Sequence, residues 1–199
     1  MDHYERIARH CQDTIESIAM SVDQLAGPLE EAAALMTTAL LADGKIIACG
    51  NGADAALAQL FVCQLLGRFE QERPALPALS LASDGAAVTA VTQHGGVNDA
   101  FARQLRALGQ PGDVLLCINS AEGGGNLLRA VQAAMERNMA VVLLTNTDDG
   151  ELGSLMRAED AVLRIQAART GQRIELFTLV LNCCSELIDQ TLFGDHGTE

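Results

Sequence analysis

The stretch DVLLCINSAEGGGNLLRAVQAAMERNMAVVLL, residues 113–144, decides the fold. It holds two short apolar runs, residues 113–118 and 140–144, and between them a glycine-rich loop followed by a helical pattern over residues 127–137. Short apolar runs that alternate with helical patterns are typical of parallel strands connected by helices. The stretch therefore predicts one strand–helix–strand unit of a parallel sheet.

The same rhythm extends outward in both directions. Three more short apolar runs occupy residues 45–49, 77–81 and 161–165, and helical patterns such as residues 55–66 and 173–192 lie between or after them. Because nearly continuous apolar strands are buried on both faces, the pattern predicts an α/β protein with a doubly wound, five-stranded parallel sheet covered by helices on both sides.

Two helices are predicted before the first strand. An apolar stripe runs through the first twenty-five residues, Gly27 and Pro28 interrupt it, and a second stripe continues to a stop near Gly44. With 199 residues and no visible repeat or linker, we expect a single domain over residues 1–199, with N-terminal helices in 1–43 and the α/β core in 44–199.

The first and last helices carry more apolar surface than one sheet can cover. The helix at residues 173–192 is apolar around most of its circumference, and the N-terminal stripe includes Ile15, Ile18 and Val22. We therefore expect a homo-oligomer in which these three side chains lie at subunit contacts.

Charge and hydropathy exclude several classes of function. Thirteen basic residues against 26 acidic ones give a formal charge of -13, which disfavours direct binding to nucleic acid. The apolar runs are too short for a membrane span, and the acidic beginning lacks the basic region of a signal peptide. These features predict a cytoplasmic protein without membrane contact.

Two loops are candidates for ligand binding, because ligands of parallel sheets bind beyond the carboxyl ends of strands. The loop after the first strand offers Asn51, Gly52 and Asp54, and the loop after the third strand offers Asn119, Ser120 and Glu122. A purely local alternative is that Asp54 and Asn126 are N-caps of the helices that follow and that Glu122 points to solvent.

Several motifs together resemble the sugar isomerase (SIS) family, in its phosphoheptose isomerase branch. They are the CGNG loop at 49–52, RFEQERP at 68–74, LGQPGDVLL at 108–116 and the ending LIDQTLF at 187–193. The resemblance covers nearly the whole chain and implies a flavodoxin-like core and a homotetramer. The branch contains enzymes that isomerise sedoheptulose 7-phosphate, and a group that associates with the replication initiator DnaA.

The acid/base positions differ from those of the enzymes in this branch. Where the enzymes carry a His and a Glu on one helical face, this chain has Leu60 and Gln64, and Asn182 replaces a His of the last helix. Ile174 stands where the enzymes have a Gln. Neither leucine nor an amide exchanges protons near neutral pH, so we expect no catalytic residues at these positions.

These differences predict a non-catalytic regulatory or binding protein of the initiator-associating kind. The implied partners are a second copy of the chain, the initiator DnaA contacting Leu192 and Phe193, and a sugar derivative, because Asp54 and Glu122 would repel a phosphate dianion. We predict no cofactor, and no metal site because no His, Cys, Asp or Glu cluster has ligand spacing. Two alternatives stay open, a phosphoheptose isomerase, with His94 and Glu175 as replacement proton-transfer residues, and a sensor of a sugar derivative.

Overall fold

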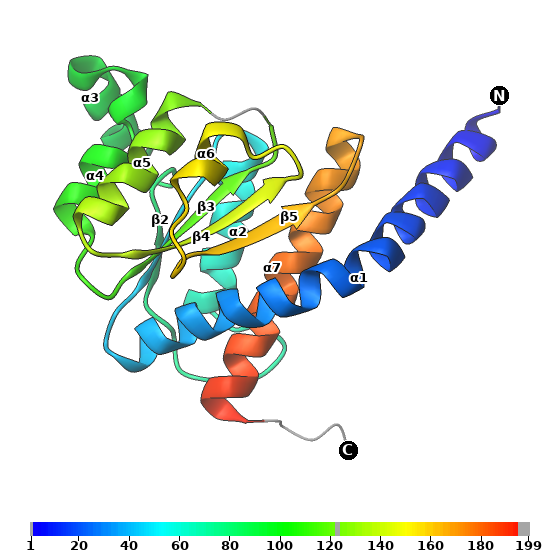
Figure 1. Cartoon of the computed structure of the whole chain (residues 1–199), viewed down its shortest axis with the longest axis horizontal. Coiled ribbons are helices and arrows are strands. Elements are labelled where there is room, and N and C mark those ends of the chain that lie inside the picture. Colours follow the sequence, from blue (N-terminus) through cyan, green and yellow to red (C-terminus); the bar gives the residue numbers. More distant parts are fainter. Residues whose placement is uncertain (1, 122–123, 195–199) are drawn as a thin grey trace.

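The computed structural model describes residues 2–121 and 124–194 and is organised around a five-stranded parallel sheet (Figure 1). The strands are β1 (Ile46–Cys49), β2 (Ala78–Ser80), β3 (Val114–Asn119), β4 (Ala140–Asn146) and β5 (Ala161–Ile165). Their order is β2-β1-β3-β4-β5, with every neighbouring pair parallel. This is the flavodoxin-like order, and it confirms the predicted fold class.

Helices cover both faces of the sheet. They are α1 (His3–Leu41), α2 (Ala53–Leu66), α3 (Gly85–Gly95), α4 (Ala102–Leu108), α5 (Gly125–Glu136), α6 (Gly150–Leu155) and α7 (Thr170–Phe193), with a short 3-10 helix at Val97–Asp99. Because side chains alternate along a strand, Val114 and Leu116 of β3 join one core with α1, α2 and α7. Leu115 and Cys117 join the opposite core with α4, α5 and α6.

The N-terminal region is one helix, so the predicted break at Gly27 and Pro28 is wrong. The helix α1 runs for 39 residues with Pro28 inside it. Leu25 and Leu29, on either side of the break, are both buried in the core that α1 shares with α7. This packing offsets the roughly 3 kcal/mol that an internal proline costs a helix. The N-terminal half of α1 projects beyond the sheet layers (Figure 1).

The helix α7 lies in the core. Its length and composition alone would allow it to cross a membrane. However, Phe177, Leu181 and Ile188 are fully buried against the sheet and its neighbouring helices. Leu192 and Phe193, at its end, are half-buried against the same core. Packing within the protein therefore buries part of the apolar surface of α7, while Leu179 stays 38% exposed.

The strand order indicates where a ligand is expected to bind. From β1 the chain passes to β2 on one side, whereas β3 lies on the other side of β1 and leads to β4 and β5. In open parallel sheets the crevice at such a reversal, beyond the carboxyl ends of the two central strands, is the usual ligand site. Here the β1–α2 loop and the β3–α5 loop, the two loops singled out from the sequence, lie at that edge of the sheet.

Candidate functional site

The two loops are joined by a pair of amide side chains. Asn51 Nδ2 donates to Asn126 Oδ1 at 3.0 Å, and Asn126 Nδ2 donates back to Asn51 Oδ1 at 2.7 Å. Gly52 has a φ of 56°, in the left-handed region where a side chain is disfavoured, so the loop turns sharply into α2. The structure thus brings the predicted ligand-binding residues Asn51 and Gly52 next to the β3–α5 loop.

Asp54 also connects the two loops. Its Oδ2 accepts the backbone N–H of Ser120 at 2.8 Å, and its side chain is buried. The alternative that Asp54 is the N-cap of α2 is wrong, because Gly52 occupies that position. Likewise Gly124, not Asn126, is the N-cap of α5. Asn119 and Ser120 are buried at the end of β3, and Glu122 lies outside the described residues.

The electrostatic environment of Asp54 combines burial with one nearby cation. Burial raises the pKa of Asp54, and hydrogen bonds from Ser120 and the charge of Arg173 partly oppose that rise. Both Asp54 Oδ1 and Arg173 Nε are buried without a hydrogen-bond partner in the described structure. Arg173 was not among the site residues expected from the sequence, although it begins the helix predicted at residues 173–192.

The positions that resemble the acid/base residues of the enzymes form a neutral network between α2 and α7. Gln64 Nε2 donates to Asn182 Oδ1 at 2.7 Å, and Gln64 Oε1 accepts from Ser185 Oγ at 2.8 Å. Leu60, on the same helix, is 39% exposed. The prediction that these groups do not transfer protons agrees with their chemistry and stays a prediction.

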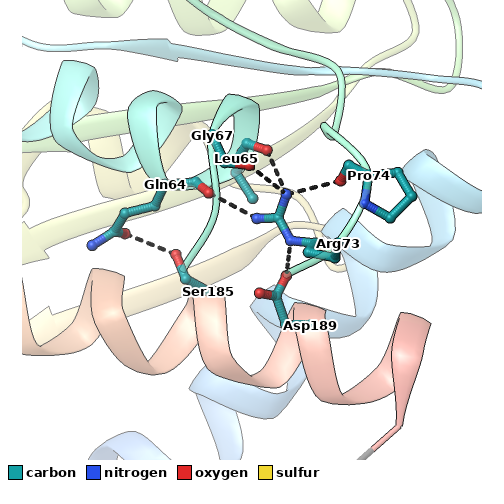
Figure 2. Close-up of polar contacts among 7 residues, drawn as sticks. All are labelled: Gln64, Leu65, Gly67, Arg73, Pro74, Ser185 and Asp189. Carbon is teal, nitrogen blue, oxygen red and sulfur yellow. Dashed lines mark hydrogen bonds and ion pairs between the residues drawn. The ribbon is translucent and has the colours of Figure 1, made fainter. Parts of the chain in front are cut away.

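A buried ion pair continues this network towards the end of α2, as Figure 2 shows. Arg73 Nε donates to Asp189 Oδ1 at 2.7 Å, and the two side chains are 1% and 4% exposed. The same guanidinium donates to the carbonyl oxygens of Gln64 and Leu65, each at 2.7 Å, and to that of Pro74 at 3.0 Å. It therefore closes the last turn of α2 and ties that helix to α7.

The proposed replacement pair is not assembled. His94 lies near the end of α3, whereas Glu175 on α7 accepts hydrogen bonds from His10 Nε2 at 2.9 Å and from Thr14 Oγ1 at 2.8 Å. These two bonds lower the pKa of Glu175. Sequence reasoning could not find the contact between His10 and Glu175, because 165 positions separate them. Among the described residues, no group of three His, Cys, Asp or Glu side chains could hold a metal ion.

The fold and the position of the site define the class of the protein. The chain belongs to the SIS domain family, whose model matches residues 9–146. Its relatives include the phosphoheptose isomerase of Halorhodospira halophila, 43% identical over 197 residues, which are 99% of this chain and 100% of the relative.

Solved structures agree with this assignment. The phosphoheptose isomerase of Neisseria gonorrhoeae has a TM-score of 0.89 and 35% identity, with 95% of this chain and 100% of that chain covered. That of Francisella tularensis has a TM-score of 0.91 and 34% identity, with 96% and 100% covered.

These comparisons correct the predicted function. The reading as a regulator of the initiator-associating kind is wrong, because relatives at 40 to 43% identity over nearly the full chain are phosphoheptose isomerases. That reading rested on a few altered positions, above all Leu60, Gln64 and Asn182, whereas the match to the isomerases covers nearly the whole chain. The prediction that Leu192 and Phe193 contact a partner protein no longer has a named partner.

Proposed function

We propose that this protein is a phosphoheptose isomerase that binds a seven-carbon sugar phosphate in the crevice between β1 and β3. The observation that carries the proposal is the full-length match to phosphoheptose isomerases at about 40% identity. The position of Asn51, Gly52, Asn119 and Ser120 at the carboxyl edge of the two central strands supports it. We retain these four residues as the ligand-binding set.

A second candidate function is a sensor that binds a sugar derivative without converting it. The neutral hydrogen bonds of Gln64 with Asn182 and Ser185 favour it. An aldose–ketose isomerisation needs a group that removes a proton from one carbon and returns it to the next. Amides and hydroxyls at these positions do not provide such a group near neutral pH.

One experiment separates the two functions. The purified protein is incubated with sedoheptulose 7-phosphate, and product is followed by NMR while binding is measured by calorimetry. Turnover supports the isomerase, and binding without turnover supports the sensor. Absence of both refutes the two functions together.

Variants show whether any signal comes from the crevice. Asn51→Ala removes one member of the amide pair and is expected to weaken binding at least about tenfold. Gln59→Ala changes an exposed amide on α2 and serves as the matched control. Equal activity of Asn51→Ala and Gln59→Ala would point to a contaminating enzyme or to a different site.

The proposal includes self-association into a homotetramer in the cytoplasm. Ile15 and Val22 on α1 are 66% and 57% exposed, and the apolar surface beside Val22 continues into a groove of about 160 Å³ between α1 and α7. Ile18, the third predicted contact, already packs against the core. All six cysteines are free, which is usual in the reducing cytoplasm.

Light scattering tests the assembly. We expect a tetramer at micromolar concentration, and its dissociation by Ile15→Asp together with Val22→Asp. Gln12→Asp places the same charge on the same half of α1 outside the apolar stripe and is expected to leave the assembly intact. A monomeric wild-type protein would contradict the proposal.

A further inference from the structure

The carboxylate of Asp54 sits where the two central loops of the sheet meet. One oxygen accepts the Ser120 N–H at 2.8 Å, although the two residues are 66 positions apart. The other oxygen is buried without a partner among the described residues. Gly50 packs so tightly against Asp54 that a Cβ at position 50 would lie 2.6 Å from the Asp54 carbonyl carbon. The loop thus packs closely against the backbone and Cβ of residue 54.

The position has the properties of an anion site. It lies at the carboxyl ends of β1 and β3, where the strand order reverses, and Asp54 is in the first turn of the 14-residue helix α2. Backbone N–H groups at such a crevice and the positive end of a helix both favour negative charge. In this structure the negative charge is supplied by the protein itself.

From this geometry we propose that Asp54 is an internal occupant of the anion site, and that the phosphate group of a ligand binds there only when this carboxylate is displaced or neutralised. Asp54 is then the residue that determines how strongly the protein binds phosphorylated sugars. That the ligand is a sugar phosphate rests on the proposed function. That an anion would compete with Asp54 for the Ser120 N–H rests on the observed hydrogen bond between these two residues.

Arg173 provides the complementary charge. It lies on α7 and is the charged group, among the described residues, that acts on Asp54. Its Nε is buried without a hydrogen-bond partner in the part of the chain that the structure describes, and one of its terminal nitrogens donates to Thr170 Oγ1 at 3.2 Å. When Asp54 leaves the site or takes up a proton, the positive charge of Arg173 is no longer compensated. An incoming anion would restore that compensation and could accept a hydrogen bond from the free Nε.

Protonation of Asp54 couples anion binding to pH. Burial raises the pKa of this carboxyl group, so it takes up a proton more readily than an exposed aspartate. The protonated side chain no longer repels an anion. Anion affinity should therefore rise as the pH falls towards the pKa of Asp54, and this dependence should disappear when the side chain is a neutral amide.

The test measures anion binding and does not depend on turnover. Sulfate is the first probe, because it stays a dianion between about pH 5 and pH 8, and sedoheptulose 7-phosphate is the second. Asp54→Asn keeps the shape of the side chain and removes its charge. The matched control is Asp84→Asn, because Asp84 also accepts a backbone N–H, that of Ala87 at 3.0 Å, but does so at the exposed start of α3.

We expect Asp54→Asn to bind sulfate at least about tenfold, and up to about a thousandfold, more tightly than the wild type near pH 8. The ratio of the two affinities should shrink as the pH falls towards the raised pKa of Asp54, and Asp84→Asn should behave as the wild type. If Asp54→Asn does not fold, the sulfate affinity of the wild type is measured alone as the pH is lowered from 8. The inference then requires that this affinity rises as the pH falls.

Three results would overturn the inference: equal sulfate affinity of Asp54→Asn and the wild type, a wild-type affinity independent of pH, or no anion binding by either protein. The failure of the proposed function looks different. Tighter sulfate binding by Asp54→Asn without any conversion of sedoheptulose 7-phosphate by the wild type would refute the isomerase and keep the inference.

Discussion

Replacement of Arg73 by methionine should remove a large part of the stability of this protein. The guanidinium is 1% exposed and pairs with Asp189, which is 4% exposed, while it also donates to carbonyl groups at the end of α2 (Figure 2). Arg73→Met removes the partner of Asp189 Oδ1, and Oδ2 has no hydrogen-bond partner among the described residues, so the buried carboxylate is left unpaired there. Breaking a buried pair in this way costs about 3 to 5 kcal/mol, a fifth or more of the roughly 5 to 15 kcal/mol typical of a domain.

Arg68→Met is the matched control. Arg68 lies five positions earlier and also pairs with a carboxylate, that of Glu72, but its side chain is 62% exposed. An exposed pair of this kind contributes about 0.5 kcal/mol or less. Both variants are unfolded with urea at one fixed protomer concentration, because self-association would make stability depend on concentration. The two variants should differ clearly in the free energy of unfolding that they lose. If the losses of Arg73→Met and Arg68→Met lie within about 1 kcal/mol of each other, the buried pair does not stabilise the protein as argued.

The pH dependence of the stability lost in Arg73→Met tests separately whether the buried Asp189 charge is its cause. Burial raises the pKa of Asp189, and the hydrogen bond and charge of Arg73 oppose that rise. Without Arg73 the pKa of Asp189 in the folded state rises further above its unfolded value. The folded variant then binds the proton more readily than the unfolded chain, so its deficit is largest above the folded pKa and shrinks as the pH falls through it. A deficit that is equal near pH 8 and near pH 5 would point to lost packing instead of a buried charge.

Three further variants test the loops and a helix start. Gly50→Ala forces a Cβ to 2.6 Å from the Asp54 carbonyl carbon and should lower the free energy of unfolding by about 1 to 3 kcal/mol, measured with urea. Asn51→Ala removes two of the three hydrogen bonds of the buried Asn126 amide and should cost about 1 to 3 kcal/mol in the same assay. Asp84→Ala removes the N-cap of α3 and should cost about 1 kcal/mol, visible as a lower melting temperature.

The sequence predicts the sheet well because its signal is local. Each strand is a short apolar run between turn residues, and the observed strands lie within two residues of the predicted ones. The continuous helix α1 was not predictable in this way. The cost of Pro28 is visible in the sequence, but the packing of Leu25 and Leu29 that overcomes it depends on α7, which is far away in the chain.

The site shows the same division between local and long-range information. The loops with Asn51 and Ser120 could be placed from strand ends alone, because parallel strands bring their carboxyl ends to one edge. The hydrogen-bond partner of Asp54 could not be predicted in this way. An Asp at the start of a helix is most often its N-cap, whereas the N–H group that Asp54 accepts belongs to Ser120 in another loop. Arg173 was missed for the same reason, because nothing near it in the sequence marks a buried, unpaired Nε.

The contact between α2 and α7 explains how a chain can share the fold of phosphoheptose isomerases while its acid/base positions are neutral. The two polar atoms of the Gln64 amide on α2 bond Asn182 and Ser185, both on α7. The Arg73–Asp189 pair connects the ends of the same two helices. These hydrogen bonds keep the helices together without any titratable group at positions 64 and 182. The fold therefore places few demands on the protonation chemistry of these positions. Identity over the full chain shows the family, and the proton-transfer step depends on a small number of side chains that the fold leaves free to change.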